Sequence, residues 1–77
     1  MTATTLPERI AVLGLGYVGL PLALALSRAG FETVGFDTNT GLIDALHAGT
    51  DPNGEVSATS LAATQCRFSH DPSALSG

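Results

Sequence analysis

The chain has 77 residues, so it forms one domain at most, and its hydrophobic fraction of 44% allows a core made mainly of Leu, Ala and Val. Three arginines and no lysine oppose seven carboxylates, which gives a net charge of −4. We therefore expect no binding to nucleic acid or to an anionic membrane surface, because both need clustered basic residues. The single cysteine, Cys66, excludes an internal disulfide and favours a cytoplasmic location.

Metal binding would have to come from His47, Cys66 and His70, which lack the paired spacing of metal ligands. We interpret them instead as a helix-surface histidine, a core thiol and a turn histidine. The sequence predicts no metal site.

The stretch Arg9–Leu13 (RIAVL) is a short apolar run, which is typical of a strand buried on both faces of a parallel sheet. It leads directly into Gly14–Gly19 (GLGYVG), which matches the pattern G-x-G-x-x-G. An apolar helix pattern follows from Leu20, with Arg28 in its last turn and Gly30 at the position of a C-cap glycine. The order of strand, glycine-rich loop and helix predicts a loop that holds phosphate.

The same apolar run also suggests a membrane or export segment. No residue from Ala11 to Leu26 is charged, but these 16 residues are fewer than the roughly 18 to 20 that span a bilayer. A signal peptide is the closer rival, with Arg9 as its basic end and the stretch 23–25 (ALA) as its cleavage site. We favour the phosphate loop because Glu8 offsets the charge of Arg9 and because glycines and a proline interrupt the apolar centre.

The rest of the chain continues to alternate strand and helix patterns. The predicted features are a strand over Glu32–Phe36, a helix over Thr40–Ala48 capped by Asn39, a turn-rich loop over Thr50–Val56, a short helix capped by Ser57 and ending at Ala63, a strand over Cys66–Ser69, and a further helix beginning at Asp71-Pro72. This order predicts an α/β fold, namely a Rossmann-like half with a three-stranded parallel sheet (β-α-β-α-β). We expect residues 1–77 to form one truncated nucleotide-binding lobe that stops at Gly77.

Each position of the glycine motif has a physical role in this interpretation. Gly14 permits the tight turn out of the strand, Gly16 leaves room for a pyrophosphate, and Gly19 lets the helix approach the sheet. The backbone N–H groups of Tyr17 and Val18, at the helix N-terminus, are expected to face the diphosphate with a favourable dipole. The alternative is a structural turn that binds no ligand.

Asp37 lies 18 positions beyond Gly19, at the end of the second predicted strand. A carboxylate at this place accepts hydrogen bonds from the adenosine ribose hydroxyls, so we predict NAD as the cofactor. The alternative role for Asp37 is that of a strand-end or turn carboxylate.

The stretch Gly14–Pro21 (GLGYVGLP), followed by 35–37 (GFD), resembles the N-terminus of the UDP-glucose/GDP-mannose dehydrogenase family. The resemblance runs from about Arg9 to Leu75 and includes 68–72 (FSHDP). It implies an enzyme that oxidises the C6 alcohol of a nucleotide sugar to a carboxylate with two NAD. The block 49–56 (GTDPNGEV) is most similar to the branch that acts on UDP-N-acetylhexosamines such as UDP-N-acetylmannosamine, an activity of polysaccharide biosynthesis.

Two departures from the family pattern bear on activity. Many members carry Arg or Lys five residues after the aspartate, near the adenosine, where this chain has Leu42. The resemblance places the catalytic cysteine, the catalytic lysine and the UDP-sugar domains beyond position 77, and Cys66 does not match the nucleophile. We therefore expect no catalytic residue and no turnover in this chain, and binding of UDP-sugar only in a full-length enzyme.

Two alternatives stay open. A β-hydroxyacid dehydrogenase also begins with G-L-G-x-x-G-x-P, although Tyr17-Val18 and the block 49–56 favour the sugar family. The second alternative is a non-catalytic dinucleotide-binding module that needs a partner chain. Because the first helix is apolar on nearly every side, we expect self-association or docking to further domains. The sequence identifies neither the sugar nor the oligomeric state.

Overall fold

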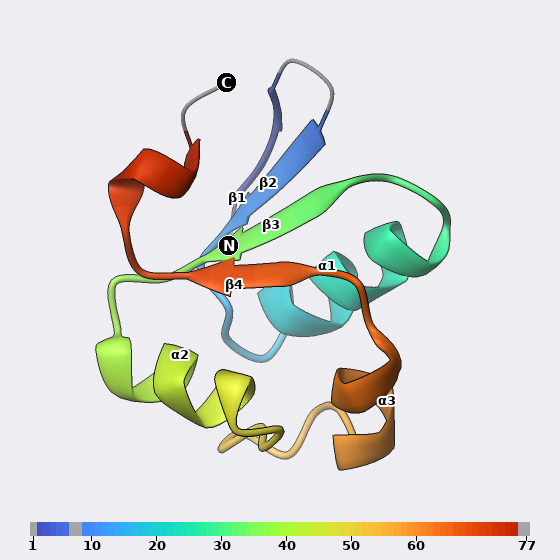
Figure 1. Cartoon of the computed structure of the whole chain (residues 1–77), viewed down its shortest axis with the longest axis vertical. Coiled ribbons are helices and arrows are strands. Elements are labelled where there is room, and N and C mark those ends of the chain that lie inside the picture. Colours follow the sequence, from blue (N-terminus) through green and yellow to red (C-terminus); the bar gives the residue numbers. More distant parts are fainter. Residues whose placement is uncertain (1, 7–8, 76–77) are drawn as a thin grey trace.

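A computed structural model describes residues 2–6 and 9–75, so residues 1, 7–8 and 76–77 of the predicted lobe lie outside the description. After the first two strands, helical segments separate the strands, with one helix between β2 and β3 and two helices between β3 and β4 (Figure 1). The elements in chain order are β1 (Thr2–Leu6), β2 (Arg9–Leu13), α1 (Gly19–Arg28), β3 (Thr33–Phe36), α2 (Thr40–His47), α3 (Ala58–Ala63), β4 (Arg67–Ser69) and the 3-10 helix η1 (Pro72–Leu75).

The sheet has the order β1-β2-β3-β4, and the pairs β2–β3 and β3–β4 are parallel. Val12 pairs with Gly35, and Gly35 pairs with Phe68, so these three residues share one face of the sheet. This arrangement confirms the predicted β-α-β-α-β unit, with strand ends within one residue of the predicted ones.

The prediction of a three-stranded sheet was wrong by one strand. β1 adds to the free edge of β2 in antiparallel register, with Thr4 opposite Ala11. Its sequence TATTL contains β-branched threonines, which suit a strand, but it lacks the apolar alternation that marks a strand with a buried face. Residues 2–5 are accordingly exposed, so pairing with β2 rather than burial holds this strand in place.

The hydrophobic core lies between the helices and one face of the sheet. Its largest fully buried side chains are Leu15, Leu20, Ile43 and Val12, which come from the glycine-rich loop, α1, α2 and β2. Helix ends are fixed as the sequence predicts, because Asn39 accepts the N–H of Leu42 and Ser57 accepts the N–H of Ser60. The core therefore binds the loop and three helices to one sheet surface.

The opposite face of the sheet is partly covered by η1, which packs on β3 and lies on the other side of the strands from α2 and α3 (Figure 1). Ala11 and Val34 point to this face and are buried. The Arg9 guanidinium donates a hydrogen bond to the carbonyl of Ala74 at 3.1 Å, which fastens η1 to the start of β2. Leu13 and Phe36, on the same face, are only half-buried.

The η1 helix begins with the cap that the sequence predicts. The Asp71 carboxylate accepts the backbone N–H of Ser73 at 2.9 Å. This hydrogen bond lowers the pKa of Asp71 below its usual value, because it stabilises the ionised form.

One carboxylate organises the loop between α2 and α3. Asp51 accepts the backbone N–H groups of Asn53, Glu55 and Val56 at 2.9, 2.7 and 3.0 Å. The loop contains Gly54 at φ +69°, a backbone conformation that glycine adopts without strain. The predicted turn thus has a defined structure with Asp51 at its centre.

Candidate functional site

The glycine motif forms the connection between the carboxyl end of β2 and the N-terminus of α1. Gly14 has φ +93°, so the turn out of β2 requires a residue without a Cβ. Its N–H donates to the carbonyl of Phe36 at 2.8 Å, which extends the pairing of β2 with β3 into the loop. In parallel α/β sheets ligands bind outside the carboxyl ends of the strands, and this loop lies there.

Leu15 anchors the loop to the sheet. Its side chain is fully buried, although the pattern of the motif gives this position no defined role. A Cβ built on Gly35 would lie 2.9 Å from Leu15 Cδ2 and 3.1 Å from Phe68 Cδ1, closer than atoms in van der Waals contact. Gly35 therefore makes room for Leu15 under the loop, a role that the sequence analysis missed.

Gly16 differs from Gly35 because nothing in the protein occupies the space beside it. A Cβ at this position would meet no atom within 4 Å, and the φ of Gly16 lies outside the left-handed range. Neither the backbone conformation nor packing against the described residues requires glycine here. The open space is what a loop needs if a diphosphate is to approach its backbone.

The N-terminus of α1 lacks a side-chain cap. Val18 occupies the N-cap position and accepts no hydrogen bond through its side chain. Within residues 2–6 and 9–75, the backbone N–H groups of Tyr17 and Val18 donate to no acceptor. Both residues are strongly exposed, so these N–H groups are accessible to solvent. They lie at the N-terminus of α1, where the positive end of the helix dipole favours binding of an anion. Gly19, the first residue of α1, is buried.

Asp37 follows the carboxyl end of β3 and lies beside the loop. Its Oδ2 accepts the N–H of Leu15 at 2.9 Å, and its Oδ1 accepts the N–H of Asn39 at 2.9 Å. The carboxylate thus connects the glycine loop to the cap of α2. Each carboxylate oxygen has a second lone pair, so the half-buried Asp37 can also accept hydrogen bonds from hydroxyl groups of a ligand. The structure brings all the sequence-predicted residues, 14, 16–19 and 37, to one edge of the sheet.

Leu42, at the position where many family members carry a basic residue, is half-buried and packs against the core. Its N–H donates to Asn39 Oδ1 at 3.1 Å. The side chain contributes to the attachment of α2, so this position supplies no cation to the site.

The other chemically active side chains lie away from the loop. Burial raises the pKa of the Cys66 thiol to about 11, so it is uncharged at neutral pH. His47 Nε2 lies 2.7 Å from the carbonyl oxygen of Phe68 and joins α2 to β4. Within the described residues, no three His, Cys, Asp or Glu side chains are grouped to hold a metal ion. None of the helices described is long and apolar enough to cross a membrane.

The sequence is similar to that of several known proteins. UDP-N-acetyl-D-glucosamine 6-dehydrogenase of Pseudomonas aeruginosa is 49% identical over 53 residues, which are 69% of this chain and 12% of the relative. UDP-N-acetyl-D-mannosamine dehydrogenase of Pyrococcus horikoshii is 46% identical over 41 residues, 53% of this chain and 10% of the relative. Protein CapL of Staphylococcus aureus is 38% identical over 61 residues, 79% of this chain and 14% of the relative.

The chain spans about a tenth of the length of these curated relatives, 10% to 14%. No solved structure shows a significant match. The model of the NAD binding domain of the UDP-glucose/GDP-mannose dehydrogenase family matches residues 8–71, which include the glycine loop, Asp37 and β4. The chain therefore belongs to the UDP-glucose/GDP-mannose dehydrogenase family, as part of its NAD-binding domain.

Proposed function

We propose that the loop Gly14–Gly19 holds the diphosphate of NAD and that Asp37 accepts the hydroxyls of its adenosine ribose. One observation carries this proposal: the uncapped N-terminus of α1 lies beside Gly16, whose missing side chain leaves open space. The N–H groups of Tyr17 and Val18 donate to the diphosphate, and the helix dipole favours its charge. NAD supplies the hydride acceptor for an oxidation, and this chain supplies its binding surface.

We propose further that the domain serves a dehydrogenase that oxidises the C6 alcohol of a UDP-N-acetylhexosamine to a carboxylate, for polysaccharide biosynthesis. The named relatives act on UDP-N-acetyl-D-mannosamine and UDP-N-acetyl-D-glucosamine, which supports this substrate class. The family match favours this function over that of a β-hydroxyacid dehydrogenase. A cytoplasmic location, expected from the single cysteine, stays a prediction.

The 77 residues do not supply the chemistry of such an oxidation. Burial raises the pKa of Cys66, which disfavours the thiolate form that acts as a nucleophile, and the chain contains no lysine. We expect the purified chain to reduce no NAD when it is mixed with UDP-N-acetylglucosamine or UDP-N-acetylmannosamine. The absorbance of NADH measures this directly, and turnover that the Cys66→Ala variant retains would contradict the assignment of catalysis to other domains.

The preference between NAD and NADP tests the role of Asp37. A 2′-phosphate on the ribose would face this carboxylate, and such a like-charge contact costs about 1 to 4 kcal/mol between watery and partly screened conditions. Titration calorimetry should therefore give tighter binding of NAD than of NADP. Asp44, an exposed carboxylate on α2, provides the control, because Asp44→Ala should leave this preference unchanged. Equal affinities of the unmodified chain for both dinucleotides would contradict the role of Asp37.

We also propose that the part of the sheet face opposite the core that η1 leaves uncovered contacts further domains of such an enzyme or a second copy of the chain. A parallel sheet is normally covered on both faces. Here η1 partly covers the face opposite the helix-packed core, and Leu13 and Phe36 on it remain half-buried. Covering them would remove more apolar surface from water.

A further inference from the structure

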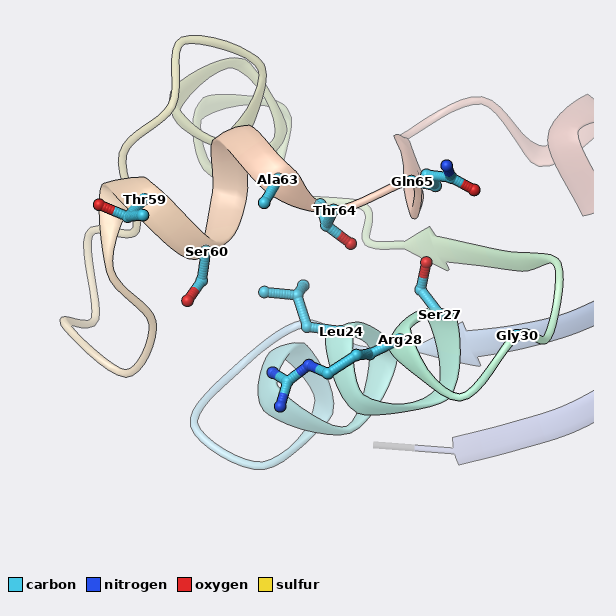
Figure 2. Close-up of a pocket in the computed structure, with 9 residues that line it drawn as sticks. All are labelled: Leu24, Ser27, Arg28, Gly30, Thr59, Ser60, Ala63, Thr64 and Gln65. Carbon is cyan, nitrogen blue, oxygen red and sulfur yellow. The ribbon is translucent and has the colours of Figure 1, made fainter.

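A cavity of about 720 Å³ lies between α1 and α3 (Figure 2). None of residues 14–19 of the glycine loop is among the residues that line it. One wall consists of the last turns of α1, with Leu24, Ser27 and Arg28. The other wall consists of α3 and the segment that leads from it to β4, with Ser60 and Thr64. Its volume falls within the range of about 300 to 1,000 Å³ that is usual for sites of small molecules.

The cavity and the NAD site lie at opposite edges of the sheet. The glycine loop follows the carboxyl end of β2, whereas the cavity is bordered by the C-terminal part of α1 and by Gln65, just before β4 begins. In a β-α-β unit the helix returns the chain to the amino ends of the strands. A ligand here would not share residues with the dinucleotide.

The lining of the cavity is rich in hydrogen-bond donors. Ser60 Oγ accepts the hydroxyl of Ser57 at 3.1 Å, and Thr64 Oγ1 accepts the N–H of Cys66 at 3.1 Å. Each hydroxyl therefore keeps its own hydrogen to donate. The guanidinium of Arg28 adds up to five N–H donors and a permanent charge. Among the described residues that line the cavity there is no Asp or Glu, so no carboxylate there opposes an anion.

The polar groups fall into two sets on either side of an apolar middle. Figure 2 shows the Arg28 guanidinium and the Ser60 hydroxyl toward one end and the hydroxyls of Ser27 and Thr64 toward the other, with Leu24 between them. The charged end suits a phosphate group, which pairs with a guanidinium through charge-assisted hydrogen bonds. The uncharged end suits hydroxyl groups. We propose that this cavity is a second ligand site, which binds a small phosphate monoester of a neutral polyol.

Nuclear magnetic resonance of the full 77-residue chain tests the proposal, with glucose 1-phosphate as the probe and with inorganic phosphate and glucose as comparison ligands. Glucose 1-phosphate should shift the amide signals of Ser60 and Thr64 in a saturable manner. Inorganic phosphate should bind more weakly, and glucose alone should cause no saturable shift. Amide signals of the loop Gly14–Gly19 report on binding at the NAD site, so the two sites are distinguished in one spectrum.

Arg28→Gln and Arg67→Gln form a matched pair for this experiment. Both arginines are exposed and both substitutions change the net charge equally, but Arg67 lies on β4 outside the cavity lining. Arg28→Gln should lower the affinity for glucose 1-phosphate about tenfold or more, the value of one strong charged hydrogen bond. Arg67→Gln should retain it.

Four results would overturn the proposal. One is the absence of a saturable shift in the unmodified chain, and another is a response confined to the loop Gly14–Gly19. The third is an equal loss of affinity in both variants, which would reflect net charge alone. If Arg28→Gln lowers thermal stability but leaves the shifts intact, Arg28 serves only the C-terminus of α1 and the site is refuted.

Discussion

Adding one methyl group at Gly16 or at Gly35 separates the requirements of the ligand from those of the fold. At Gly16 the new Cβ would meet no protein atom within 4 Å, and the φ of this residue lies outside the left-handed range. Gly16→Ala should therefore not destabilise the chain, and it gains up to about 1 kcal/mol because the unfolded chain has fewer conformations to lose. At Gly35 the same methyl would lie 2.9 Å from Leu15 Cδ2, so packing must shift. Such overpacking typically costs about 1 to 3 kcal/mol.

Thermal unfolding followed by circular dichroism measures the effect on the fold. In a domain of this size, 1 kcal/mol moves the midpoint by about 4 to 8 °C. Gly35→Ala should lower the midpoint by that amount or more, and Gly16→Ala should leave it unchanged or raise it.

Titration calorimetry with NAD measures the effect on the site. The methyl of Gly16→Ala would occupy the space proposed for the diphosphate, and a clash of about 1 to 3 kcal/mol weakens binding roughly 5- to 150-fold. Gly16→Val, with a larger side chain, should abolish binding with a smaller effect on the fold. A Gly16→Ala variant that is stable and binds NAD as tightly as the unmodified chain would refute the placement of the diphosphate. A Gly16→Ala variant that unfolds would show that the fold itself requires this glycine.

Three further outcomes are expected. Asp51→Ala removes the acceptor of three N–H groups in the loop 51–56, so it should destabilise the chain by about 1.5 to 3 kcal/mol in urea unfolding, and no change in midpoint would contradict its central role. Asp71→Ala should lower stability at neutral pH, because the hydrogen bond from the Ser73 N–H stabilises the ionised carboxylate and so lowers the pKa of Asp71. The difference from the unmodified chain should begin to shrink as the pH falls below the usual value of about 4, and should disappear once the pH has fallen through the lowered pKa of the folded chain. The purified chain should self-associate in analytical ultracentrifugation or unfold below about 65 °C, and a strict monomer with a higher midpoint would argue against a contact surface on the part of the sheet face that η1 leaves uncovered.

The part of the fold that the sequence predicts is the part with strong local patterns. The buried run in β2, the glycine motif and the apolar pattern of α1 follow one another, and each predicts its own element. β1 could not be predicted in this way, because an exposed threonine-rich strand depends on its partner and not on its own pattern. A strand can therefore be predicted from this sequence where its burial requires a run of apolar residues.

The candidate site was predictable in its residue types but not in its contacts. The motif assigns Gly16 and Asp37 to a ligand, yet it says nothing of Gly35, whose role arises because β3 pairs with β2 in a register that brings Leu15 above it. Likewise, the hydrogen bond from the Leu15 N–H to Asp37 depends on the distance between two segments 22 residues apart. Such distances follow from tertiary packing, which a single sequence does not contain.

The Asp37 carboxylate connects the glycine loop to the start of α2, so it couples the local unfolding of these two segments. Asp37 accepts N–H groups from Leu15 and Asn39, and Asn39 in turn accepts the N–H of Leu42. Local unfolding of the glycine loop should therefore release a constraint on the first turn of α2, and we expect the two segments to open as one cooperative unit. We therefore expect a ligand that binds the loop to slow amide hydrogen exchange at Leu42 as well, although it need not touch α2. Exchange rates at the start of α2 should thus report whether the loop is occupied by a ligand.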